Sequence, residues 1–277
     1  MIYSDWHIHS CYSYDATLPL QTLIDAAQAQ GMRRVGVTDH VNFNDNGFLQ
    51  NLYDSAKYVG EASKKNPMLI LGVELNPFSQ AQFDYTVKNC GSRDGFVPPV
   101  QDKPYNIALA VTKQELIDLG VRYAVGAAHA RLDIGDKLKY DDVDNIIREW
   151  HREQMFLACD ERVTILGHPW WHGKNIWNED FSVIPHSMNM ELAAALKENG
   201  KYVECNYGMI CHPGRSDKFR HQYAEFMREL FEFGIPVTFG TDQHHEYPDE
   251  RKNLEMYLYE AGFRDGDISE VAEKDLW

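Results

Sequence analysis

The strongest constraint on the fold is a regular alternation of short apolar segments with amphipathic helical segments along the 277 residues. Seven short segments are rich in β-branched and other apolar residues and are bounded by turn or capping residues, as strands are. They are Ile2–Trp6, Arg34–Thr38, Met68–Val73, Arg122–Ala127, Val163–Gly167, Tyr202–Cys205 and Val237–Gly240. Helices are predicted at Leu20–Gln30, Asp54–Lys65, Thr112–Leu119, Asp141–Cys159, Met188–Glu198, Lys218–Phe233 and Pro248–Ala261.

Strands that alternate with helices predict a parallel α/β fold. Seven such units in a chain of this length favour a distorted (β/α)7 barrel, related to the TIM barrel, over an open sheet. No GxGxxG motif follows the first strand, which argues against a dinucleotide-binding sheet. We expect a single barrel domain over residues 1–277, with long loops at about 76–111 and 169–185. Both loops follow strands and would overhang the carboxyl-end face; the tryptophans of the second either stack on a substrate or pack on the barrel rim.

Composition restricts the partners and the compartment. The chain has 42 Asp and Glu against 27 Lys and Arg, a formal net charge of −15, which makes nucleic acid an unfavourable partner. It contains no run of about 18 apolar residues that could span a membrane, and its first ten residues lack the basic and apolar regions of a secretory signal. Five cysteines without a CxxC pair fit reduced thiols. We therefore expect a cytoplasmic protein, whose oligomeric state the sequence does not determine.

Histidines and carboxylates follow most of the predicted strands. The strand-end segments are Asp5–His9, Thr38–His40, Gly72–Glu74, Ala128–Arg131, Gly167–Pro169, Glu204–Asn206 and Gly240–His245. Each motif alone is weak, but the carboxyl ends of parallel strands meet at one face of a barrel, so together they predict a metal site there. Imidazole nitrogen and carboxylate oxygen are the usual ligands of Zn, Mn and Fe.

Spacing within these motifs has a geometric consequence. Residues i and i+2 of an extended segment project to the same side, so His7 and His9 can chelate one ion, and Asp242 with His244 can do the same. A carboxylate such as Glu74 has two oxygens and can bridge two cations.

The ordered series HxH, TDH, GxE, a single histidine, GHP and GTDxH, from Asp5 to about Gly262, resembles the polymerase-and-histidinol-phosphatase (PHP) family. The resemblance implies a distorted (β/α)7 barrel with two or three divalent transition-metal ions (Zn, Mn or Fe) at the carboxyl ends of the strands. It implies three ligand groups. These are His7, His9, Glu74 and Asp242 for the first ion; Glu74, His129 and His168 for the second; and Asp15, His40 and His244 for the third.

The same resemblance implies a phosphoesterase that hydrolyses a small phosphomonoester, with histidinol phosphate as the leading substrate. Two neighbouring ions would turn a water into a hydroxide nucleophile, with Glu74 as the bridge. Asp242 or a nearby histidine would supply the proton for the departing alkoxide. Candidate substrate-binding residues are Arg131, Arg215, His212 and His172, because a guanidinium suits a phosphate and the two histidines could line the site.

Three other functions stay open. A metal-dependent amidohydrolase also has HxH on its first strand and Asp on a late one, although no strand-end Lys is present here as a candidate bridge. A nuclease is disfavoured by the net negative charge. A non-catalytic metal-binding or regulatory module is disfavoured because the set of candidate ligands is complete.

Overall fold

The computed structural model describes residues 1–41, 48–79, 107–129, 143–172, 177–248 and 251–277. In this part of the chain the parallel strands are β1 (Ser4–Ile8), β2 (Arg34–Val37), β3 (His40–Val41), β4 (Leu69–Leu75), β7 (Tyr123–Gly126), β8 (Ile165–Leu166), β9 (Tyr202–Asn206) and β10 (Val237–Gly240). A separate antiparallel pair joins β5 (Phe78–Ser79) to β6 (Ile107–Ala108). The α-helices are α1 (Leu20–Ala29), α2 (Phe48–Lys65), α4 (Lys113–Asp118), α5 (Val143–Cys159), α6 (His186–Glu198), α7 (Tyr207–Cys211), α8 (Asp217–Phe233) and α9 (Arg251–Glu260), and 3₁₀ turns are η2 (Phe181–Val183) and η3 (Glu273–Asp275).

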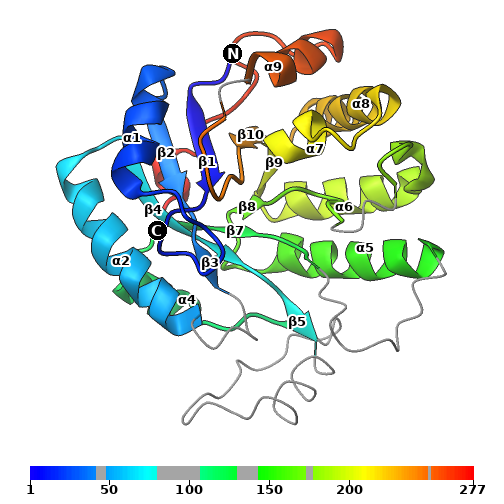
Figure 1. Cartoon of the computed structure of the whole chain (residues 1–277). Coiled ribbons are helices and arrows are strands. Elements are labelled where there is room, and N and C mark those ends of the chain that lie inside the picture. Colours follow the sequence, from blue (N-terminus) through cyan, green and yellow to red (C-terminus); the bar gives the residue numbers. More distant parts are fainter. Residues whose placement is uncertain (42–47, 80–106, 130–142, 173–176, 249–250) are drawn as a thin grey trace.

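The parallel strands form one sheet in the order β1-β2-β4-β7-β8-β9-β10, with β3 paired to β4. Two backbone hydrogen bonds join its ends: the amide of Asp242 donates to the carbonyl of His7 over 2.6 Å, and the amide of His9 donates to the carbonyl of Gln243 over 3.1 Å. The result is a nearly closed barrel of seven strands with the helices outside it (Figure 1), as the sequence predicts. Closure makes His7 and Asp242 neighbours, although they lie at opposite ends of the sequence.

Two apolar clusters stabilise the barrel. One joins Trp6, Ile70, Tyr123, Val125, Ile165, Tyr202 and Val271, which come mainly from five different strands, so this cluster fills the barrel interior. The larger cluster contains the alternate strand residues, such as Ala124 of β7, together with the apolar faces of the helices. Side chains that alternate between the two sides of each strand thus account for both clusters.

Tyr123 occupies interior space that two glycines leave open. A Cβ atom on Gly36 of β2 would lie 1.7 Å from the Tyr123 hydroxyl oxygen, and one on Gly72 of β4 would lie 2.6 Å from its ring. The hydroxyl donates a hydrogen bond to the carbonyl of Trp6 over 2.7 Å. The tyrosine therefore links β7 to β1 across the interior, and the two glycines permit this.

Several helices begin and end where the sequence predicts. The N-terminus of α4 has a capping box, in which Thr112 accepts from the amide of Glu115 and Glu115 accepts from the amide of Thr112. Helix α8 ends at Gly234, whose φ of +96° is a conformation that a residue with a Cβ rarely adopts.

The structure also differs from the predictions at several boundaries. β4 runs to Leu75 and contains Glu74, α2 begins at Phe48 rather than Asp54, and β8 is reduced to Ile165–Leu166. The two-residue strands β3, β5 and β6 and the five-residue α7 are absent from the predictions, because such short elements carry too few residues to show a period.

Parts of both predicted loops lie outside the described residues. Of the 76–111 excursion, the described ends pair as β5 and β6. In the 169–185 loop, Trp170 and Trp177 are at most 2% exposed, and the indole nitrogen of Trp177 donates to the carbonyl of Trp170 over 2.8 Å. These two tryptophans pack into the barrel rim. None of the helices in the described part of the chain is long and apolar enough to cross a bilayer.

The Gly36–Tyr123 contact makes a stability prediction. Gly36→Ala displaces the Tyr123 hydroxyl and should lower the free energy of unfolding by roughly 1–3 kcal/mol, as overpacked cores do. The matched variant Gly60→Ala in α2 meets only an ordinary contact at 3.5 Å and should raise it by about 0.5–1 kcal/mol. Urea unfolding of both variants measures this, and a Gly36→Ala protein as stable as wild type contradicts it.

Candidate metal centre

The candidate ligands lie together at the carboxyl ends of the strands. His7 is in β1 and His9 follows it; His40 is in β3 and Glu74 in β4. His129, His168 and Asp242 follow β7, β8 and β10. Parallel pairing places His40 directly opposite Glu74 in register. Three groups could each hold an ion: His7, His9, Glu74 and Asp242; Glu74, His129 and His168; and His9, His40 and His244.

The first group is compact and buried. Nε2 of His9 lies 3.1 Å from Oδ1 of Asp242 and 3.3 Å from Oε2 of Glu74. Nε2 of His7 lies 3.4 Å and 3.5 Å from the same two oxygens. His7, His9 and Glu74 are at most 1% exposed. These four side chains are the predicted first group.

The second group uses the other oxygen of Glu74. Its Oε1 lies 3.3 Å from Nε2 of His168 and 3.5 Å from Nε2 of His129. Glu74 therefore has one oxygen in each of two neighbouring groups. This is the arrangement that a bridging carboxylate needs.

The third group lies beside the first and is more open. Oδ2 of Asp15 is 3.3 Å from Nε2 of His40 and 3.5 Å from Nε2 of His244, and these two nitrogens are 3.4 Å apart. Nδ1 of His40 lies 2.6 Å from Oε2 of Glu74, so the imidazole spans the space between Glu74 and Asp15. The three side chains predicted to hold a third ion, Asp15, His40 and His244, are thus brought together, and His9 lies close enough to join them.

Apart from the 2.6 Å contact between His40 and Glu74, these spacings fit a bound cation better than direct hydrogen bonds. Donor atoms about 2.1 Å from a tetrahedral zinc lie roughly 3.4 Å apart, close to the spacing within all three groups. Nε2 of His7 is buried without a hydrogen-bond partner among the described residues. Buried polar atoms are normally paired, so this unpaired nitrogen is in a position to coordinate a metal ion.

Glu204 supports the first group from behind. Its Oε1 is 3.0 Å from Nδ1 of His7, and its Oε2 accepts from the backbone amide of His168. A carboxylate on the far nitrogen of an imidazole fixes the ring and its tautomer for metal binding. A Cβ on Gly240 would lie 1.9 Å from Oε1 of Glu204, so only glycine at this position of β10 leaves room for the carboxylate. The sequence places Glu204 at a strand end but predicts no role for it.

Backbone strain is concentrated at the centre. Among the described residues, His168, Trp170 and Asp242 have positive φ without being glycine. Two of them are candidate ligands and the third is two residues from His168. Such conformations cost about 1–3 kcal/mol each and occur mostly at functional sites.

The charges of the centre are strongly coupled. Burial alone would raise the pKa of Glu74, but His40, His129 and His7 hold it well below its usual range. Burial likewise opposes charge on His40, yet Glu74 and Asp15 outweigh it and raise the pKa of His40 to about 10. Burial dominates at His129 and lowers its pKa to about 3. The carboxylates are therefore ionised, and protons on some histidines take the place that cations would otherwise fill.

The predicted substrate-binding residues have different surroundings. Arg215 is 5% exposed, its Nε and Nη1 have no partner among the described residues, and burial lowers its pKa to about 10. His212 is exposed, and its Nδ1 accepts from the amide of Gly214 over 3.0 Å. His172 is buried, with its ring centroid 4.4 Å from that of Trp150, so it packs inside the rim. Arg131 lies outside the described residues.

Trp171 lies at the edge of the second group. Its ring centroid is 5.2 Å from that of His129 and 5.5 Å from that of His168. The side chain is only partly buried, unlike those of Trp170 and Trp177. An aromatic face therefore remains partly accessible beside two candidate ligands.

Comparison with known proteins agrees with this geometry. The model of the PHP domain family matches residues 5–208, nearly three quarters of the chain. The chain belongs to the PHP family. Asp242 and His244 follow the matched segment, and barrel closure brings them to the other ligands. No curated protein sequence matches the chain significantly.

Two solved structures share the fold. Histidinol phosphate phosphatase from Lactococcus lactis, in complex with zinc, L-histidinol and phosphate, is 17% identical with a TM-score of 0.64, over 95% of this chain and 94% of that one. A candidate histidinol phosphatase from Listeria monocytogenes is 12% identical with a TM-score of 0.61, over 87% of this chain and 95% of that one. Family and donor groups together support a metal-dependent hydrolase.

The pKa of His40 predicts how the ion-free protein responds to pH. A histidine pKa raised from 6.5 to about 10 by folding contributes stability that is fully present below pH 6.5 and is lost as pH rises through about 10. In EDTA, we expect the wild-type melting temperature to fall more than that of His40→Gln between about pH 7 and about pH 9.5. Thermal unfolding tests this, with the exposed His186→Gln as control. If the melting temperatures of wild type and His40→Gln change with pH in parallel, His40 is not protonated in the folded, ion-free protein.

Proposed function

We propose that this protein is a metal-dependent phosphoesterase that hydrolyses a small phosphomonoester. The observation that carries the proposal is the position of the two carboxylate oxygens of Glu74. Each oxygen faces a different group of histidines, at the spacing of donor atoms around a tetrahedral metal ion. Two-metal sites with such a bridge are typical of phosphatases. Membership of the PHP family supports the same conclusion.

The residues that would hold the ions follow from the groups. His7, His9, Glu74 and Asp242 would hold the first, and Glu74, His129 and His168 the second. Asp15, His40 and His244 would hold the third, with His9 also close to it. Zinc, manganese and iron all suit nitrogen and carboxylate donors. Bound divalent ions supply the positive charge that ionises water near neutral pH and neutralises phosphoryl oxygens.

The protein's own residues orient the reaction and move a proton. Burial alone would raise the pKa of Asp242, but His7 and His9 keep it below its ordinary value, so the carboxylate is ionised. The amide of Asn206 lies 3.5 Å from Oδ2 of Asp242 and helps to fix it. In this proposal Asp242 takes the proton of the attacking water and later returns it to the departing alkoxide.

Substrate recognition is assigned to the guanidinium group of Arg215 and the aromatic ring of Trp171. A buried guanidinium without a carboxylate partner is unfavourable unless an anion binds to it, so Arg215 would hold a phosphoryl oxygen or another anionic group. Trp171 would pack against a flat leaving group, and His212 would border the substrate from the same loop as Arg215. Histidinol phosphate, whose imidazole is flat, is the leading candidate, in line with L-histidinol and phosphate in the Lactococcus structure.

The function is tested by metal content and turnover together. We expect the purified protein to contain at least two equivalents of a divalent metal and to release phosphate from histidinol phosphate or another small phosphomonoester. Glu74→Gln and His7→Ala remove a ligand and should each lower turnover more than about 100-fold, the upper end of losses for residues that only support ligands. The exposed Glu198→Gln serves as control. A metal-loaded protein that cleaves amides but no phosphomonoester overturns the proposal in favour of an amidohydrolase.

Arg215 gives a second prediction, in which stability and activity change in opposite directions. Arg215→Met should raise KM for the phosphorylated substrate about 10- to 100-fold, because charge-assisted hydrogen bonds are lost. The same variant should unfold at a temperature equal to or above that of wild type, since an unpaired buried charge is removed. Steady-state kinetics and thermal unfolding measure both effects, with the surface variant Arg148→Met as control. An unchanged KM excludes Arg215 from substrate binding.

A further inference from the structure

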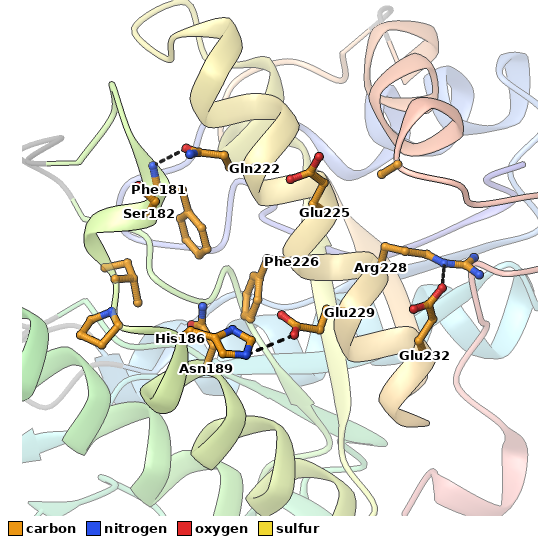
Figure 2. A pocket seen from close by; sticks show the side chains of 13 residues that line it. Phe181, Ser182, His186, Asn189, Gln222, Glu225, Phe226, Arg228, Glu229 and Glu232 are labelled. Atoms are coloured by element: carbon orange, nitrogen blue, oxygen red, sulfur yellow. Dashed lines mark hydrogen bonds and ion pairs between the residues drawn. The ribbon is translucent and has the colours of Figure 1, made fainter.

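A separate pocket lies on the outside of the barrel between α6, α8 and the η2 turn (Figure 2). Its volume of about 620 Å³ is in the range of small-molecule sites. None of the residues that line it belongs to the three candidate metal groups. The pocket therefore has to be explained independently of the hydrolytic centre.

The floor of the pocket is apolar and firmly packed. Phe181, Ile184 and Phe226 are at most 4% exposed, and the rings of Phe181 and Phe226 lie 5.2 Å apart between centroids. Gln222 accepts a hydrogen bond from the amide of Phe181 over 2.8 Å, which ties η2 to α8. This floor suits an aliphatic or aromatic body, and its rigidity spares the pocket the cost of ordering on binding.

One buried polar atom in the pocket lacks a partner. Asn189 of α6 is 7% exposed and lines the pocket, and its Oδ1 has no hydrogen-bond partner among the described residues. An unpaired buried carbonyl costs free energy that a donor on a ligand would recover. The acceptor therefore selects for a ligand that carries an N–H group.

The rim of the pocket is acidic. Glu225, Glu229 and Glu232 of α8 line it, together with a single guanidinium, that of Arg228. That guanidinium is already engaged, because it donates to Glu232 over 2.9 Å and to Asp267 over 3.3 Å. Glu229 has the exposed His186 at 3.6 Å as its one ion-pair partner among the described residues (Figure 2). The net field over the apolar floor therefore favours a positive charge.

We propose that this pocket binds a small organic cation, namely a protonated primary amine on an apolar or aromatic body. The body lies on Phe181 and Phe226, while the ammonium group donates to Oδ1 of Asn189 and faces Glu225 and Glu229. The three features together define the ligand. The apolar floor disfavours hydrated metal ions, the acidic rim disfavours anions, and the unpaired acceptor disfavours ligands without a hydrogen-bond donor.

The probe for the test is 2-phenylethylamine, with 2-phenylethanol as the neutral match of equal size. Saturation-transfer difference NMR on the full-length protein at pH 7 should give a millimolar Kd for the amine, as expected for about nine non-hydrogen atoms. The alcohol should bind at least about 10-fold more weakly, a ratio typical of a charge-assisted hydrogen bond. The double variant Glu225→Gln/Glu229→Gln should weaken the amine to the level of the alcohol.

Two further variants complete the design. Asn189→Leu keeps the number and branching of the side-chain heavy atoms but removes the acceptor, and should weaken amine binding with little effect on the alcohol. Glu198→Gln removes an exposed carboxylate elsewhere on the molecule and should leave both ligands unaffected. The proposal is overturned if amine and alcohol bind equally, if neither binds, or if the double variant binds the amine as wild type does. Because the glutamates are on the surface, that variant decides the matter even if Asn189→Leu does not fold.

Discussion

The centre depends on a single buried carboxylate. Glu74 is completely buried, and its two oxygens lie within 3.5 Å of nitrogens from five histidines. Burial of an unpaired carboxylate costs several kcal/mol, so its surroundings have to supply positive charge from several directions. Protonated histidines can do so in the ion-free protein, and divalent cations would do so more fully, since they need no proton on the ring. The three groups are therefore parts of one electrostatic unit.

The barrel is built so that this unit can form. His7 and His9 come from one end of the sheet and Asp242 from the other, and only closure through backbone bonds between these segments places them together. Asp5 strengthens the junction, because it accepts from the amide and the hydroxyl of Thr241. Behind the ligands, Glu204 fixes His7 in the space that Gly240 leaves. The positive φ values of His168 and Asp242 are the cost of pointing these side chains inward.

The sequence predicts the architecture and the meeting of these side chains at one face of the barrel, for a definite physical reason. In a parallel barrel the carboxyl ends of all strands lie at the same face, so residues at these strand ends lie close together. That rule places His7, Glu74 and Asp242 without knowledge of any contact. The single-domain prediction over residues 1–277 and the assigned roles of the site residues remain predictions.

The surroundings of the ligands were harder to predict, because burial and partners depend on packing between distant segments. His172 looks like a residue of a binding loop, yet it packs against Trp150 of α5. Glu204 supports His7, 197 positions away, and no local pattern encodes that contact. Trp171 is only partly buried, whereas Trp170 and Trp177 of the same loop are buried, and the local sequence does not distinguish them.

Arg215 carries a second buried charge, and its surroundings differ from those of Glu74. Glu74 is surrounded by groups that offset its charge, whereas Arg215 is buried beside Met209 and over the ring of Phe219, and its Nε and Nη1 have no hydrogen-bond partner in the described part of the chain. A π face and a sulfur atom repay only part of the desolvation of a guanidinium. A residue kept for stability alone would be better replaced by an apolar one of similar size. An anion that binds and leaves, as the proposed phosphorylated substrate and its phosphate product would, offsets the remaining cost.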